Sequence, residues 1–156
     1  MVDKVEFMFA LLEGSPLFEG LSEAEINGLL ECAEVDDFAD GQTVVEEGSL
    51  GDAIFLLCDG KLSISTRDAQ GRRIELAQLD QRGAFFGEIT IADPGPRSAT
   101  VCASGSALLM RLPLDALDAF FAKFSNAQVV ILRNIARVLA RRLRDSNALV
   151  SSLSSS

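Results

Sequence analysis

Two oppositely charged side chains flank a short loop in the middle of the sequence. In the stretch FFGEITIADPGPRSAT, residues 85–100, Glu88 follows Gly87, and Arg97 follows a Gly-Pro pair. An arginine guanidinium offers parallel N–H donors to a phosphate or a carboxylate, and the proline before it stiffens the backbone. A glycine has no side chain, so a bound group can approach the backbone closely. These residue types predict a binding site for an anion.

The carboxylate of Glu88 narrows the choice of ligand. A carboxylate cannot bind a neighbouring anion favourably, but it accepts a hydrogen bond from a hydroxyl group. If residues 88–92 form a single helical turn, their free N–H groups point at the anion as well. The ligand that satisfies both side chains carries an anionic group next to a hydroxyl, as a sugar phosphate does.

Helices are expected at the start of the chain. Residues 2–12 form a short amphipathic segment that ends at the Gly14-Ser15-Pro16 break. Ser22, with Glu25 three positions later, is a capping-box signature for a second helix. Both elements precede a change in the sequence pattern at about residue 35.

Short strands are expected after that change. Glycines recur about every ten residues from 41 to 71, which is typical of an all-β sandwich or barrel. Residues 62–65 and 74–79 predict a hairpin around a turn at 68–71. Later strands are expected at 98–101 and 107–112. We interpret Gly48, Gly51 and Gly60 as turn residues with positive φ, and Asp52 as a turn-stabilising side chain.

Helical periodicity returns after Pro113. Residues 114–121 predict one helix and residues 126–150 a longer one, with apolar residues at three- and four-residue steps. The expected fold class is mainly β with flanking helices: N-terminal helices, a barrel over about 35–112, and C-terminal helices over about 114–150. A length of 156 residues predicts a single domain over 1–156.

The composition excludes several classes of function. The chain has no histidine, which removes Ser-His-Asp and Cys-His catalysis and a histidine-ligated metal centre. We expect no enzyme, no metal and no cofactor. The three cysteines Cys32, Cys58 and Cys102 are odd in number and far apart, which predicts free thiols in a reducing compartment, the cytoplasm.

The charged residues limit which partners we expect, since they disfavour nucleic acid and a membrane. The net charge of −9 disfavours nucleic acid as a partner of the whole surface. Asp3, Glu6 and Glu13 interrupt the first apolar run, so we expect neither a signal peptide nor a membrane span.

Several segments together resemble a known family. GAFFGE at 83–88, followed by RSATV at 97–101, is similar to the phosphate-binding cassette of cyclic nucleotide-binding domains. Further similar segments are EGSLGDAIF at 47–55, Gly60, PLFEGL at 16–21 and RRLR at 141–144. The resemblance covers about residues 15–150, and it implies a β-roll of jelly-roll type flanked by helices.

The resemblance also implies roles for individual residues. Arg97 would pair with the exocyclic oxygens of the cyclic phosphate, and Glu88 would accept a hydrogen bond from the ribose 2′-hydroxyl. Ser146 and Asn147, just after the RRLR segment, would contact the purine edge. The ligand-binding residues that it implies are Phe86, Gly87, Glu88, Ile89, Arg97, Ser98, Ala99, Ser146 and Asn147.

The expected function is a cyclic nucleotide sensor, for cAMP ahead of cGMP, that rearranges its C-terminal helices on binding and acts on an unknown downstream protein. One alternative is a degenerate barrel that serves as a protein-interaction scaffold. Another is a sensor of a different nucleotide, such as a cyclic dinucleotide. A barrel enzyme of cupin type is a third, although the lack of histidine makes its metal site hard to build.

Five arginines punctuate the last predicted helix, at positions 133, 137, 141, 142 and 144. We interpret them as a solvated helix face whose charges suit the helix dipole, with an acidic partner as the alternative. The chain ends soon after Val150, too early for a helix-turn-helix module, so direct DNA binding is not expected. The apolar stripe of the same helix predicts a homodimer.

Overall fold

Two short helices open the chain in the computed structural model, which describes residues 3–154. They are α1 (Lys4–Glu13) and α2 (Glu23–Cys32), with a 3₁₀ turn, η1 (Pro16–Phe18), between them. The Ser22 hydroxyl accepts a hydrogen bond from the Glu25 N–H at 3.2 Å, and the Glu25 carboxylate accepts one from the Ser22 N–H at 2.9 Å. The predicted capping box is confirmed. Residue 2 of the first predicted helix lies outside the described residues.

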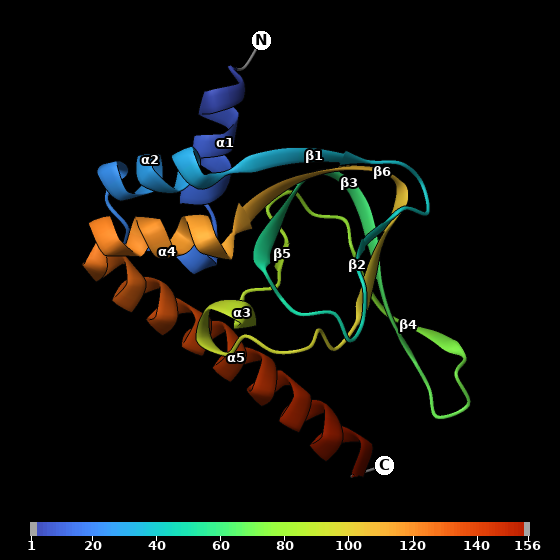
Figure 1. The fold of residues 1–156 in the computed structure, drawn as a ribbon. Coiled ribbons are helices and arrows are strands. Elements are labelled where there is room, and N and C mark those ends of the chain that lie inside the picture. The colour runs from blue at the N-terminus through green and yellow to red at the C-terminus, as the bar shows by residue number, and fades with distance from the viewer. Residues whose placement is uncertain (1–2, 155–156) are drawn as a thin grey trace.

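Strands from the middle of the chain form one antiparallel sheet within residues 3–154. They are β1 (Glu34–Phe38), β2 (Thr43–Val45), β3 (Ala53–Arg67), β4 (Arg73–Leu79), β5 (Phe85–Phe86) and β6 (Thr100–Pro113). β6 pairs with β1, β2 and β3, and β3 also pairs with β4 and β5. The sheet curls into a roll with helices packed at one end (Figure 1). The predicted fold class, a mainly β jelly-roll-type roll with flanking helices, is confirmed.

Two strands differ from the prediction. The strands expected at 98–101 and 107–112 are one strand, β6, in which Gly105 has a φ of 77°. β3 begins at Ala53 instead of 62, and its first six residues are all buried. A strand buried on both faces has no alternation of apolar and polar residues, so the alternating pattern marked only its second half.

The β3–β4 hairpin turn is confirmed. The Asp68 carboxylate accepts hydrogen bonds from the Gln70 N–H at 2.9 Å and the Arg72 N–H at 2.8 Å, as a turn aspartate does. Gly48 and Gly60 have positive φ, as predicted, but Gly51 does not.

The C-terminal helices are α4 (Leu114–Lys123) and α5 (Ser125–Ser154), both somewhat longer than expected. The first half of α5 packs on the body through Ala127, Ile131 and Ile135. Buried Asn134 fixes its position by donating to the carbonyl oxygens of Leu17 at 3.0 Å and Glu19 at 2.9 Å. From residue 141 onward α5 is exposed, and Figure 1 shows this half extending past the β-roll.

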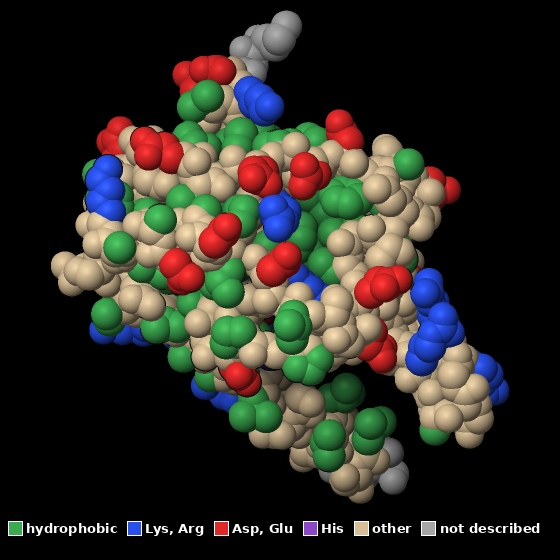
Figure 2. Space-filling model, viewed as in Figure 1, with side chains coloured by type: hydrophobic (Ala, Val, Ile, Leu, Met, Phe, Trp, Pro, Cys, Tyr) green, Lys and Arg blue, Asp and Glu red, His purple; other side chains and the backbone are tan. Residues whose placement is uncertain are grey.

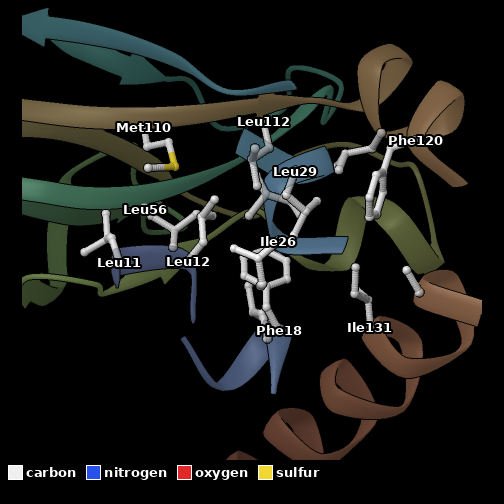
Figure 3. Close-up of a cluster of buried hydrophobic side chains, with 14 of the residues drawn as sticks. Leu11, Leu12, Phe18, Ile26, Leu29, Leu56, Met110, Leu112, Phe120 and Ile131 are labelled. Atoms are coloured by element: carbon white, nitrogen blue, oxygen red, sulfur yellow. The ribbon is translucent and has the colours of Figure 1, made fainter. Parts of the chain in front are cut away.

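Two apolar clusters hold these layers together. One lies between the helices and the sheet, where Phe18, Ile26 and Leu29 meet Leu112 and residues of α4 and α5 (Figure 3). The other fills the inside of the roll, around Phe55 and Leu109. The first cluster ties α5 to the N-terminal helices, and the second supports the loop that carries Glu88 and Arg97.

Charge is distributed unevenly over the molecule. Residues 1–60 contain fifteen Asp and Glu residues but a single lysine, whereas the remaining residues carry thirteen of the fourteen Lys and Arg residues. In Figure 2, acidic side chains are spread over the upper face near α1 and β1, and basic ones gather at the β3–β4 hairpin and along the lower margin. Among the helices of residues 3–154, none is long and apolar enough to cross a membrane.

Candidate functional site

The loop between β5 and β6 has a shape that depends on Gly87. Its φ is 84°, and a Cβ built there would lie 2.6 Å from the Ala53 carbonyl oxygen. Only glycine fits a left-handed backbone pressed this closely against a neighbouring strand. The chain then turns through the short helix α3 (Ile89–Ala92), which is the single helical turn that the sequence predicts. Figure 1 shows α3 lying between the β-roll and α5.

Backbone hydrogen bonds hold Arg97 in place at the far end of this loop. The Arg97 N–H donates to the Ser49 carbonyl at 2.7 Å, and the Arg97 carbonyl accepts from the Gly48 N–H at 2.8 Å. The preceding Pro96 forms an isolated β-bridge with Leu50. The Gly-Ser loop before β3 and the Pro-Arg segment before β6 therefore fix each other.

The Arg97 guanidinium lies almost entirely below the surface, with 9% of the side chain exposed. Its Nη2 donates to the Asp52 carboxylate at 3.2 Å, and its Cζ lies 5.8 Å from the centre of the Phe55 ring. Phe55 itself stacks on Phe86 with the ring centres 4.8 Å apart. Within the described chain Asp52 is the one hydrogen-bonding partner of the guanidinium, which leaves other N–H donors of the fork for an occupant of the cavity.

Asp52 has a different role from the one expected. The sequence predicts a turn-stabilising side chain, but its carboxylate pairs with Arg97 and lies 3.6 Å from Arg111. Arg111 in turn pairs with Glu34 at 2.9 Å. Gly51, the neighbour of Asp52, lies directly against the Thr90 side chain of α3, so the close approach explains this glycine and a turn does not. Both roles depend on segments far apart in the sequence, which a local turn pattern cannot reveal.

Glu88 is buried, with 3% of its surface exposed, and its partner comes from α5. The Arg142 Nη1 donates to Glu88 Oε1 at 2.6 Å, and the Arg142 Cζ lies 5.7 Å from the Phe85 ring centre. The interpretation of five solvated arginines is therefore wrong for Arg142. Its position could have signalled this, because residue 142 falls on the same side of the helix as buried Ile131 and Ile135.

A cavity of about 420 Å³ is lined by both Glu88 and Arg97. Its lining includes the apolar side chains of Val45, Ile64 and Val101 together with the charged groups of Glu88 and Arg97. Cavities of this size, mostly apolar with a few converging polar groups, are typical of small-molecule sites.

The structure brings most of the predicted ligand-binding residues to this cavity. Those in its lining are Phe86, Gly87, Glu88, Ile89, Arg97, Ser98 and Ala99. Ser146 and Asn147 are not in the lining but lie on the exposed half of α5. The helix rises about 1.5 Å per residue, so a position one turn beyond Arg142 has already passed the cavity. Lining residues that the sequence did not suggest are Val45, Ile64, Thr90, Asp93, Val101 and Arg142.

The site combines a β-roll, a loop shaped by Gly87, a recessed arginine and a buried carboxylate around one cavity. These features are those of a domain that binds a small ligand. The family model described as "Cyclic nucleotide-binding domain" matches residues 35–124, which is more than half of the chain. The chain belongs to the cyclic nucleotide-binding domain family.

Individual relatives agree with this assignment. The chain is 32% identical over 140 residues to the "CRP-like cAMP-activated global transcriptional regulator" of Mycobacterium tuberculosis, covering 90% of this chain and 60% of that protein. It is 35% identical over 118 residues to a "cGMP-dependent protein kinase" of Eimeria tenella, covering 76% of this chain and 11% of the kinase. The N-terminal domain of a transcriptional regulator from Streptomyces coelicolor A3(2) has a similar structure, with a TM-score of 0.74, 28% identity, and coverage of 90% and 94%. The chain thus spans only about 60% of the length of the regulator from M. tuberculosis.

Proposed function

We propose that this chain binds a 3′,5′-cyclic nucleotide, cAMP ahead of cGMP, in the cavity beside α3. The observation that carries the proposal is that Arg97 and Glu88, nine residues apart, line one cavity of about 420 Å³. Relatives described as cAMP-activated and cGMP-dependent proteins support the ligand class. In this arrangement the Arg97 fork donates to the cyclic phosphate, and Gly87, Ser98 and Ala99 supply further donors from the loop backbone and the Ser98 hydroxyl.

Glu88 accepts a hydrogen bond from the ribose 2′-hydroxyl in this proposal. Its carboxylate already accepts from Arg142, and one carboxylate has room for several donors. A ligand that adds a donor to Glu88 therefore changes the environment of a residue on α5. Ligand binding then biases the position of α5 to the extent that the two arrangements differ in affinity for the ligand. Ser146 and Asn147 would join the site only if α5 moves toward the cavity or a second copy supplies them.

The output proposed here passes through α5 to a partner. Apolar or small residues follow a three-four spacing along the helix at positions 129, 132, 136, 139, 143, 146, 150 and 153. Of these, Val129, Leu143, Val150 and Leu153 are more than half exposed. A repeat with this spacing favours a two-helix seam, which supports a homodimer through α5. We call these eight positions the α5 seam.

The proposed regulatory function does not require this chain to catalyse a reaction. Burial raises the pKa of the Cys58 thiol, and burial together with the nearby Glu31 raises that of Cys32, so neither thiol is activated as a nucleophile. The cysteines are free, which suits the proposed reducing, cytoplasmic location. We propose a single ligand-binding domain with no chemistry of its own.

Calorimetric titration tests the function directly. We expect saturable binding of cAMP, weaker binding of cGMP, and a higher melting temperature with either ligand, since a ligand that binds only the native state stabilises it. A cyclic dinucleotide in the same assay separates the other nucleotide class. No heat and no thermal shift at millimolar cAMP and cGMP would instead favour the interaction scaffold.

A further inference from the structure

Four arginines lie on one face of α5 and make no ion pair within residues 3–154. Arg133, Arg137 and Arg141 recur every four residues, and Arg144 follows three residues later. At about 100° per residue they fall within an arc of roughly 80°, and they extend over about 17 Å of the helix. All four side chains are exposed. We call these residues the arginine stripe.

The arginine stripe avoids the faces that packing uses. Ile131, Asn134 and Ile135 face the body of the protein, and Arg142 reaches the buried Glu88. The α5 seam occupies a further side of the helix, as the three-four spacing of its positions shows. All four arginines are exposed in the folded chain, and none of them is one of the seam positions.

The arginine stripe is a row of like charges on a molecule that is acidic as a whole. The net charge is −9, and residues 1–60, at the other end of the chain, contain fifteen acidic residues. Such a molecule is repelled at long range by a polyanion of large extent, such as duplex DNA or an anionic bilayer. A short acidic segment can contact the arginine stripe without approaching the acidic surfaces elsewhere on the molecule, so it is repelled less than an extended polyanion is.

The geometry of the arginine stripe selects the form of that segment. α5 is one continuous helix from Ser125 to Ser154, so the four arginines follow one another along the same face without a break. Carboxylates that recur every three or four residues on a second helix have the same rise of about 5 to 6 Å. Arginine binds carboxylates through two parallel N–H donors, which makes such pairs directional.

We propose that the arginine stripe is a docking surface for an acidic helix of a partner protein, with glutamate or aspartate on one face at the spacing of the stripe. This surface is separate from the nucleotide cavity, because none of the four arginines is in the cavity lining.

The test uses two synthetic helical peptides of identical composition. In the first, four glutamates share one face with the spacing of the stripe; in the second, they are distributed round the helix. Both are titrated into the full chain at low ionic strength, where ion pairs are least screened. The N–H signals of the arginine Nε groups are followed by NMR, together with fluorescence anisotropy of the labelled peptide. The variant is R137Q/R141Q, and the control R72Q/R73Q removes the same charge from the exposed β3–β4 hairpin.

We expect the matched peptide to shift the signals of the stripe arginines and to lose roughly tenfold in affinity in R137Q/R141Q. We expect the affinity of R72Q/R73Q for the matched peptide to stay within about twofold of the unsubstituted chain. The redistributed peptide should bind the unsubstituted chain several-fold more weakly than the matched peptide does. Equal binding of the two peptides, or equal loss in the two variants, would reduce the stripe to diffuse charge and overturn the proposal. So would tighter binding of duplex DNA, or of phosphatidylserine vesicles, than of the matched peptide through the same arginines.

Discussion

Arg97 and the arginine stripe present the same guanidinium group in two opposite environments. Arg97 is 9% exposed, is paired with Asp52, and lies over an aromatic ring. The arginines of the stripe are exposed and lack an ion pair in the described chain. A fixed, recessed arginine suits a small ligand whose atoms must be positioned, because its geometry is set before binding. A row of free arginines suits a partner that brings its own carboxylates.

Arg142 is intermediate between the two environments, since its side chain is partly exposed and pairs with a buried carboxylate. It also shows that adjacent residues of the chain can lie in different environments. It directly follows Arg141 of the stripe, yet its guanidinium reaches Glu88 in the cavity lining. One residue step on a helix turns a side chain by about 100°, which is enough to separate a site contact from a surface charge. Neighbouring arginines on this helix are therefore expected to respond differently to the same substitution.

The largest effect is expected for the loop that holds the site. Gly87→Ala places a Cβ 2.6 Å from the Ala53 carbonyl at a φ of 84°. We expect the free energy of unfolding to fall by about 3 kcal/mol, from the left-handed backbone and the steric overlap together. Denaturant unfolding measures it. Gly48→Ala is the matched control, because Gly48 has a φ of 87° but open space at its Cβ, so it should lose only about 1–2 kcal/mol. Equal losses would mean that Gly87 matters for its φ alone.

Arg97→Ala is expected to have the next largest effect, on ligand affinity. Loss of a charged hydrogen-bonding partner should weaken cAMP binding by about 2 kcal/mol, which calorimetry detects as roughly thirtyfold. Arg97→Lys should fall between, since a lysine keeps the charge but not the fork. Arg137→Ala, on the stripe, should leave cAMP affinity within about twofold. If Arg97→Ala also binds normally, the comparison between the two kinds of arginine fails.

Glu88→Ala is expected to change selectivity. Wild-type protein should prefer cAMP over 2′-deoxy-cAMP by about 1.5 kcal/mol, since the deoxy ligand leaves the carboxylate without its hydroxyl donor. In the variant this preference should nearly vanish, as competition between the two ligands would measure. A preference that survives the substitution would assign the 2′-hydroxyl to another residue.

The smallest effect separates Arg142 from Arg141. Arg142→Gln leaves the buried Glu88 carboxylate without its partner, and we expect about 1 kcal/mol of lost stability, a modest value because the arginine side chain is 54% exposed. Arg141→Gln should change stability by less than about 0.5 kcal/mol. A double-mutant cycle with Glu88→Gln isolates the pair. Identical effects of the two single substitutions would show that the ion pair contributes nothing.

Much of the fold follows from local patterns in the sequence. The Ser22 capping box, the Asp68 turn and the two C-terminal helices were predicted because caps, turns and helical periodicity depend on residues within a few positions of one another. The boundaries of β3 and β6 were not predicted. The first six residues of β3 are all buried and give no alternating signal, and Gly105 with its exposed neighbour Ser106 interrupts the pattern of β6.

The sequence by itself also determined the loop from Gly87 to Ala99, because glycine, proline and two charges act over a short span of chain. Only the tertiary structure decided what meets that loop. It brought Asp52 to Arg97 across 45 positions and Arg142 to Glu88 across 54. It also directed Arg142 inward while the arginine stripe stayed in solvent. Such pairings depend on how the sheet rolls and where α5 crosses it, and no residue's immediate neighbours in the chain carry that information.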